Sequence, residues 1–381
     1  MVNGLFAHCA ERRRTQRGNR PAPGKSVRTV TRVPRRPPAF VIAFLLALAA
    51  FFVTFQLGAP RQTPFGVPAG WSAELTGVDH PGILRSGRRL SHDVYAGFFP
   101  NLAYAVERAR AGGDGLLWNP YQNCGQPFFA MITNALLYPP HLLALVVGAD
   151  HALRLIPFIN LTLAGLFAYW LCRDLGTSVA AALCGAVAFE LGHAMADATV
   201  WVPIISGSYV WLPAALLCCD RAIRAPSVTR AVALGVVLAL QLLAGFPQML
   251  VDTYQLVSLR LLWELLTGRP AHPWGAMRAV GGGLLLAPCL AAVQLLPAIE
   301  ATLPSVRSGG LRVEDMAVSG FLDWQDFRLN VGGHLATFQP LVVVACIVAA
   351  VAWLRPATTS HPLIYGLVGV TALVLAFGPN T

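Results

Sequence analysis

The sequence predicts an all-α polytopic membrane protein with about nine transmembrane helices, one additional re-entrant or short helix and a long first extracytoplasmic loop. Three observations lead to this prediction. Hydrophobic residues make up 55% of the 381-residue chain and charged residues only 12%, whereas soluble domains carry about 25% charged residues. The mean hydropathy is +0.57, and several apolar runs are long enough to cross a bilayer. A basic segment precedes the first run, as expected for a cytoplasmic N-terminus.

Residues 1–38 form this basic, proline-rich segment. They hold ten Arg and Lys residues and one acid, Glu11, so the segment carries +9 of the formal net charge of +10. We expect a disordered tail on the cytoplasmic side of the membrane, followed by a first transmembrane helix at 39–57. The charge therefore indicates orientation, and nothing else in the sequence points to nucleic acid. The segment is too long for a cleavable signal peptide.

The predicted extracytoplasmic loop, 58–133, is the longest polar section. Within it, Val94–Arg110 has apolar residues spaced for one helix face, which indicates an amphipathic helix lying on the membrane. The stretch Gly112–His141 is too polar and too broken by Gly and Pro for a span, yet it is rich in aromatic and amide side chains. We interpret this stretch as a shaped polar surface at the membrane interface. A structural plug or interfacial anchor is the alternative.

Residues 134–381 are predicted to be a multi-span transmembrane domain that is incomplete at its C-terminus. The apolar segment Asn134–Gly148 contains Pro139-Pro140 and is too short for a full span, so a re-entrant or interfacial element fits it better. If this segment does not cross the membrane completely, the short basic linkers between the predicted spans all fall on one side of the membrane. The predicted full spans are Ala39–Leu57, Ala152–Cys172, Ser178–Gly192, Val202–Cys219, Ala231–Phe246, Met249–Leu266, Ala279–Ile299, Leu335–Leu354 and Leu363–Phe377.

Asp93 is the first candidate for chemistry, because it lies in the predicted outer loop just before the amphipathic helix. An outward carboxylate is able to act as a general base or to bind a metal ion. A helix N-cap is the alternative role. The eight cysteines lie mostly in apolar segments and form no Cys-x-x-Cys pattern. No motif for a nucleotide or metal cofactor occurs, so the sequence identifies neither a cofactor nor metal ligands.

Other polar residues fall near the predicted outer ends of the spans. Glu190, His193 and Asp197 gather at one of these ends, where they either face water or snorkel to the boundary. Gln248 follows a Gly-Phe-Pro turn and shares a helix face with Asp252, four residues on. A simple tight turn is the alternative there.

A further group lies around and after a proline near the end of a later span. Gln294 and Glu300 flank this proline, and Arg307 follows them. Guanidinium groups bind phosphate through two hydrogen bonds, although an ordinary interfacial arginine is the alternative. A carboxylate, an arginine, several amides and an aromatic shelf on one face would together suit a phosphorylated, membrane-anchored substrate.

Several motifs follow one another along most of the chain. They are Leu117-Trp-Asn-Pro-Tyr121, Gly125-Gln-Pro127, Leu137-Tyr-Pro-Pro140, Leu243-Ala-Gly-Phe-Pro-Gln248, Gln294-Leu-Leu-Pro297 with Glu300, Ser305-Val-Arg307 and Phe377-Gly-Pro-Asn-Thr381. Together with Asp93 upstream of Phe99-Pro100, these motifs resemble those of the YfhO-like bacterial membrane proteins. The chain departs from the family pattern at Phe246, where His is usual, and at Thr381, where family members continue.

The YfhO-like family is related to the GT-C glycosyltransferases. The resemblance therefore implies a GT-C-like fold and transfer of a sugar from a polyprenyl-phosphate-linked donor to an envelope polymer, lipid or protein on the outer face. It places the essential acidic residue of the first outer loop at Asp93. For substrate binding we expect Trp118, Asn119, Tyr121, Gln126, His193, Gln248, Gln294, Glu300 and Arg307.

Two other classes of function are compatible with the sequence. One is a truncated or degenerate GT-C-like scaffold that binds polyprenyl phosphate or a partner without catalysis. The other is a transporter or flippase of lipid-linked sugars. Charged residues lining the middle of the membrane would favour the transporter.

Overall fold

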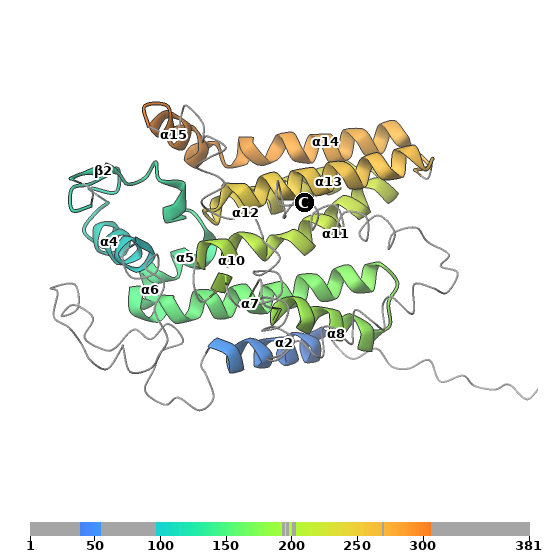
Figure 1. Ribbon diagram of the computed structural model, residues 1–381, viewed down its shortest axis with the longest axis horizontal. Coiled ribbons are helices and arrows are strands. Elements are labelled where there is room, and N and C mark those ends of the chain that lie inside the picture. The colour runs from blue at the N-terminus through green and yellow to red at the C-terminus, as the bar shows by residue number, and fades with distance from the viewer. Residues whose placement is uncertain are drawn as a thin grey trace, which may run out of the picture. The chain divides into compact units, whose positions relative to one another are not determined.

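A computed structural model of the chain is drawn in Figure 1. The structure describes residues 39–54, 97–113, 115–122, 124–192, 195, 198–199, 203–268 and 270–305. All of them belong to one compact unit that begins at residue 38. The predicted tail 1–38, loop residues 58–96 and the predicted spans Leu335–Leu354 and Leu363–Phe377 lie outside the described residues.

Helices make up most of the described chain. They are α2 (Ala39–Thr54), α4 (Phe99–Arg110), α5 (Pro139–Leu142), α6 (Ala144–Val147), α7 (Ala149–Asp174), α8 (Val179–Glu190), α10 (Pro203–Tyr209), α11 (Trp211–Arg224), α12 (Val228–Leu243), α13 (Pro247–Leu266), α14 (Pro273–Leu290) and α15 (Ala292–Thr302). Two short strands, β1 (Trp118–Asn119) and β2 (Gln126–Pro127), pair antiparallel, and a 3-10 helix, η3 (Ile132–Asn134), follows.

Two described helical segments are long and apolar enough to cross a membrane. They are α7 and the segment Pro203–Arg224, which holds α10 and α11, while the bent pair α14 and α15 makes a third if it is one span. Helices α8 and α12 are apolar but shorter. The described chain is therefore a helical protein with helices able to span a membrane, as the composition predicted. The number of nine spans stays a prediction.

The span predicted at Ala279–Ile299 is not one straight helix. Helix α14 ends at Leu290, α15 begins at Ala292, and the pair is bent by 70°. Pro288 has no N–H to donate to the carbonyl of Leu284, which weakens α14 shortly before the bend. The hydroxyl of Tyr254 donates to that carbonyl oxygen instead, at 2.8 Å. A side chain from α13 thus satisfies the backbone group that the proline leaves free.

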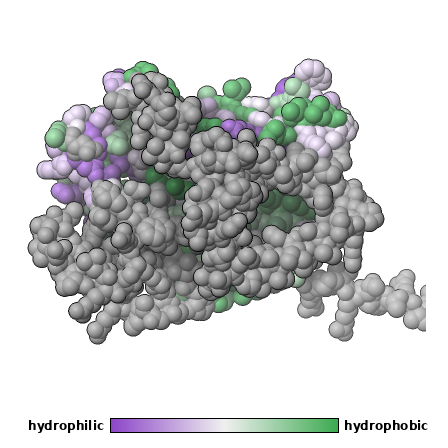
Figure 2. All heavy atoms as spheres, in the orientation of Figure 1, coloured by the Kyte–Doolittle hydropathy of each residue, from purple (hydrophilic) through white to green (hydrophobic). Residues whose placement is uncertain are grey.

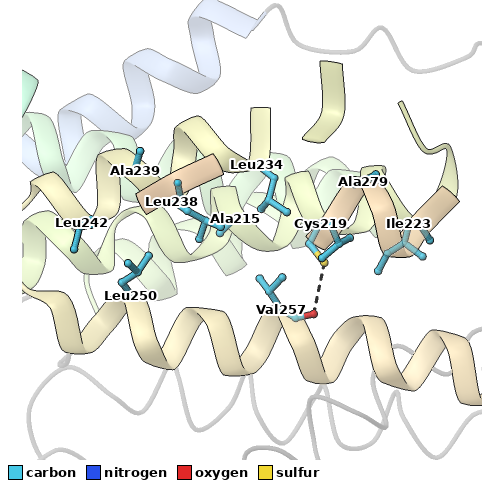
Figure 3. Packing of buried hydrophobic residues seen from close by; sticks show 14 of the residues in the cluster. Ala215, Cys219, Ile223, Leu234, Leu238, Ala239, Leu242, Leu250, Val257 and Ala279 are labelled. Carbon is cyan, nitrogen blue, oxygen red and sulfur yellow. Dashed lines mark hydrogen bonds between the residues drawn. The ribbon is translucent and has the colours of Figure 1, made fainter. Parts of the chain in front are cut away.

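Helices α11 to α14 share the largest hydrophobic core of the described chain, part of which is drawn in Figure 3. Glycines bring α12 and α14 close together. A Cβ atom at Gly235 would lie 2.9 Å from the side chain of Leu286, and one at Gly283 would lie 2.9 Å from that of Leu234. Small residues at contact positions are typical of helices that pack within membranes, because they let the backbones approach closely.

Basic residues gather where several helices begin or end, at what we call the basic end: residues 173–179, 221–230 and 266–278. Arg221 Nε lies 3.1 Å from Asp174 Oδ1, and Arg224 also pairs with Asp174, which joins the ends of α7 and α11. Gly275 packs against Pro226, which adds the start of α14 to the group. These segments lie at the right of Figure 1.

The opposite ends of the same helices meet the polar stretch that follows α4. We call this the loop end: α4 to α6 with the chain between them, α10, the turn 244–246 and α15. It lies at the left of Figure 1, and Figure 2 shows hydrophilic residues gathered on this side of the view. The segment 134–148 forms only the short helices α5 and α6, each of four residues, before α7 begins.

Candidate functional site at the loop end

The candidate site is built on the chain from Gly115 to His141, which we call the loop platform. Strands β1 and β2 pair Asn119 with Gln126 and Trp118 with Pro127. Between the strands, Cys124 and Gly125 adopt positive φ angles of 61° and 105°. A Cβ atom at Gly125 would lie 2.8 Å from Cζ2 of Trp118, so only glycine lets the indole lie against this turn.

Helix α4 holds the loop platform through Tyr104. The Tyr104 hydroxyl lies 2.9 Å from the carbonyl oxygens of both Gly115 and Trp118, so its hydrogen is shared between two acceptors. Its ring packs edge-on against the buried ring of Phe128, at 4.8 Å between centroids. The guanidinium of Arg108 lies 5.3 Å from the centre of the Tyr104 ring, in a cation–π contact.

A chain of amide hydrogen bonds continues through the platform. Asn101 of α4 donates to Asn134 Oδ1 at 2.7 Å, and Asn134 Nδ2 donates to the carbonyl oxygen of Phe128 at 2.7 Å. Gln294 of α15 donates to the carbonyl oxygen of Phe129 at 2.5 Å. Asn134 and Gln294 are buried, and their amide nitrogens donate to two backbone carbonyls of the platform.

The platform also rests on the helices beneath it. The Tyr138 hydroxyl donates to Asn160 Oδ1 of α7 at 2.8 Å and lies 3.3 Å from the carbonyl oxygen of Gly207 in α10. At the turn between α12 and α13, Gly245 has a φ of 99°, and a Cβ atom there would lie 3.0 Å from the carbonyl oxygen of Ile132. The next residue, Phe246, donates its N–H to Ser208 Oγ at 3.2 Å.

One histidine is buried inside the platform. His141 is 5% exposed, and its ring meets Phe98 and Tyr138 edge-on, at 5.3 and 5.2 Å between centroids. Burial lowers the pKa of His141 to about 4, because the apolar surroundings disfavour the charged imidazolium. Burial also raises the pKa of the Tyr138 hydroxyl. Both side chains are therefore neutral at physiological pH.

Three of the predicted substrate-binding residues are buried and bonded within the protein. Asn119 Oδ1 accepts from the N–H of Tyr121 at 2.9 Å, and Gln126 Nε2 donates to Gln122 Oε1 at 2.5 Å. Gln294 holds Phe129, as described above, although its Oε1 has no hydrogen-bond partner among the described residues. Each of these three amides therefore makes a hydrogen bond inside the protein.

Four other predicted residues are exposed. Trp118 is 52% and Tyr121 76% exposed, and both lie on the platform. Gln248 is exposed at the start of α13, beside the turn that packs on the platform, and Glu300 is exposed near the end of α15. The structure thus brings Trp118, Asn119, Tyr121 and Gln126 together on one element and joins Gln294 to it. Asp93, His193 and Arg307 lie outside the described residues.

The residues that organise the platform include several that sequence patterns did not single out. Asn101 and Tyr104 lie on the predicted amphipathic helix. The prediction of that helix rested on the spacing of its apolar residues and did not use these two side chains. Asn134 and Asn160 are polar residues within largely apolar segments, which is a usable signal, because buried amides must find partners. Among the described residues, no group of three or more His, Cys, Asp or Glu side chains is placed to hold a metal ion.

Comparisons with known proteins add no relative to this description. No protein-family model, no curated protein and no solved structure matches the chain. The resemblance to the YfhO-like family therefore stays a prediction from the motifs.

Proposed function

We propose that the chain is a multi-span protein of a bacterial inner membrane that acts as a GT-C-type glycosyltransferase on the outer face. It would transfer a sugar from a polyprenyl-phosphate-linked donor to an envelope polymer, lipid or protein. The observation that supports this proposal most is the loop platform, an aromatic and amide surface at one end of a group of apolar helices. A fixed surface of this kind suits a substrate that is itself anchored in the membrane.

The orientation is inferred from the charges at the two helix ends. Arg173, Arg221, Arg224 and Arg230 all lie at the basic end, which the positive-inside rule assigns to the cytoplasm. The loop platform then faces outward and the N-terminal tail is cytoplasmic. The short helices α5 and α6 support the interpretation of 134–148 as a partial element, which this orientation requires, in a protein with nine full spans.

The proposed reaction forms and breaks one bond at the anomeric carbon of the sugar. An acceptor hydroxyl oxygen attacks that carbon, the bond to the lipid phosphate oxygen breaks, and polyprenyl phosphate leaves with the electron pair. Asp93 takes the proton of the attacking hydroxyl as general base. Arg307 would bind the leaving phosphate and stabilise its developing charge. Both roles rest on the family resemblance and on residue chemistry.

The exposed aromatic residues of the platform have a separate role in this proposal. Trp118 and Tyr121 present large rings beside polar groups, a combination suited to a membrane–water boundary and to the faces of a sugar. His193, Gln248 and Glu300 complete the proposed substrate surface. Asn119, Gln126 and Gln294 would position this surface through their internal hydrogen bonds.

The transfer assay tests this proposal directly. Membranes that carry the wild-type chain, Asp93→Asn or Asp150→Asn are incubated with radiolabelled polyprenyl-phosphate sugars, and label in the envelope fraction is counted. Asp150 is an exposed carboxylate at the start of α7 and serves as the matched control. We expect transfer in the wild type and in Asp150→Asn and at least a hundredfold loss in Asp93→Asn at equal expression. Equal transfer in all three would remove Asp93 from catalysis.

A non-catalytic scaffold is the second candidate, and one observation favours it. Asn119, Gln126 and Gln294 are buried and hydrogen-bonded within the protein, which leaves less of their hydrogen-bonding capacity for a sugar. This candidate predicts no transfer from any donor in the panel, together with retained binding of polyprenyl phosphate to the membranes.

A further inference from the structure

Glu190, at the end of α8, is the most completely buried carboxyl group of the described chain. Its exposed fraction is 0%, and neither Oε1 nor Oε2 has a hydrogen-bond partner among the described residues. The sequence allowed a boundary residue that snorkels to water. The structure shows the opposite for Glu190, because the side chain points into the protein.

The carboxyl group lies against the middle of α7. A Cβ atom at Gly165 would collide with Glu190 Oε2 and lie 3.0 Å from its Cδ, and the same point is 3.1 Å from Leu46 of α2. Gly165 is sixteen residues from the start of α7 and nine from its end. At about 1.5 Å per residue, these distances are about 24 and 14 Å. The carboxyl group is therefore far from both ends of the helix.

The described surroundings of Glu190 are apolar. The packed side chains of α2, α7 and α8 in this region are Ile42, Leu46, Leu166, Ala168, Tyr169, Val179, Leu183, Ala186 and Phe189. The described part of α2 has no titratable residue, and the charged residues of α7 are confined to its first six and last two positions. The other titratable side chains near these faces are Tyr169 and Cys172 of α7 and Tyr209 of α10, whose ring stacks on Phe189, while Cys184 of α8 is exposed.

An ionised carboxylate in such a place is costly, because it has lost its water and finds neither a counter-charge nor a hydrogen bond among the described residues. We propose that Glu190 is a proton-binding site held between α2, α7 and α8. The neutral acid occupies the space left by Gly165, and it releases its proton to water, becoming a carboxylate, only when these helices move apart. This site goes beyond sugar transfer, which does not require it, and it is the kind of group that couples proton binding to movement within a membrane.

A hydrophobic carbodiimide tests the site in native membranes. Dicyclohexylcarbodiimide partitions into apolar regions and adds to a protonated carboxylic acid, and the adduct rearranges to a stable N-acylurea without a leaving group. Mass spectrometry of the labelled chain then locates the modified residue. We expect at least tenfold more label on Glu190 than on Glu107, an exposed glutamate of α4. A water-soluble carbodiimide with an added amine should give the reverse preference.

Variants and a change of pH distinguish a proton site from a cation site or a water-exposed carboxylate. Glu190→Gln should abolish the label, and Gly165→Ala should reduce it at least threefold by displacing the carboxyl group. The matched control is Gly281→Ala, where a Cβ atom meets nothing within 4 Å. In the wild type, raising the pH should decrease the label on Glu190. The proposal is overturned if Glu190 of the wild-type chain reacts only with the water-soluble carbodiimide. It is also overturned if sodium ions suppress the label at constant pH, because that result would indicate a cation site.

Discussion

Gln294 and Phe129 are 165 residues apart in the chain, yet the Gln294 side chain donates to the Phe129 carbonyl oxygen at 2.5 Å. This hydrogen bond ties α15 to the loop platform. It also gives the buried Gln294 side chain a partner, because the amide nitrogen donates to a backbone carbonyl. Substrate binding by Gln294 stays a prediction, and the structure shows that its amide nitrogen is bonded to the platform.

The first prediction concerns this hydrogen bond. Gln294→Leu leaves the Phe129 carbonyl without its donor and should destabilise the folded protein by about 1–3 kcal/mol. Thermal unfolding in detergent measures the effect. Val293→Ala, which changes an exposed neighbour on the same helix, should have little effect. Equal midpoint temperatures of unfolding for the two variants would show that the hydrogen bond contributes nothing to stability.

The second prediction concerns the contact between Gly125 and Trp118. Gly125→Ala places a Cβ atom 2.8 Å from the indole, whereas Gly112→Ala has a similar φ of 106° and open space around it. Both variants share the backbone strain, so their difference isolates the clash. Gly125→Ala should be less stable than Gly112→Ala by about 1–3 kcal/mol. Adding Trp118→Ala to each variant should remove most of that difference, and a persisting difference would contradict the packing.

The third prediction concerns buried charges near the basic end. Arg260 Nε lies 2.9 Å from Asp220 Oδ1, and Arg260 Nη1 lies 2.6 Å from Glu264 Oε1, with all three side chains buried. Arg260→Met leaves two carboxylates without this partner and should cost about 3–5 kcal/mol. Arg221→Met removes an arginine that is half exposed and should cost less than about 1 kcal/mol.

The same ionic group offers a rescue experiment. Combining Arg260→Met with Asp220→Asn and Glu264→Gln removes the charges that Arg260 neutralises, so the combined variant should recover much of the lost stability. Thermal unfolding of the single, double and triple variants measures this coupling. Additive losses in the triple variant would show that the three side chains do not act as one group.

The fourth prediction is a dependence of stability on pH that arises from His141. Its pKa in the folded protein, about 4, is below the ordinary value of 6.5, so the unfolded chain binds the proton more readily. The stabilising contribution is therefore complete above pH 6.5 and is lost as the pH falls toward 4. The shift corresponds to about 3 kcal/mol. His141→Leu should flatten the stability profile between these pH values, and an unchanged slope would exclude His141 as its source.

Much of the helical architecture could be predicted from the sequence. The runs at Ala152–Cys172 and Met249–Leu266 correspond in position to α7 and α13, and of these two helices α7 is long and apolar enough to cross a membrane. The bend between α14 and α15 could not be located in the same way. Prolines were visible near it, but the hydrogen bond from Tyr254 that accommodates Pro288 depends on tertiary contact.

The candidate site was only partly predictable for the same reason. The stretch from Gly112 to His141 was recognisable as a special surface from its composition, and the structure shows it as an organised platform. Which amides face a ligand and which face the backbone depends on distant partners, such as Phe129 for Gln294. Composition also gave no sign that Glu190 would turn inward against Gly165.

Labelling of native cysteines tests the central claim most directly, namely that the loop platform faces outward and the N-terminal tail faces the cytoplasm. Cys124 is exposed in the turn between β1 and β2, and Cys9 lies in the tail. Intact spheroplasts are treated with a membrane-impermeant maleimide, and peptides are identified by mass spectrometry, with Cys124→Ser as the control. The account predicts label on Cys124 in intact spheroplasts and on Cys9 only after the membrane is opened. Label on Cys9 but not on Cys124 in intact spheroplasts would contradict it.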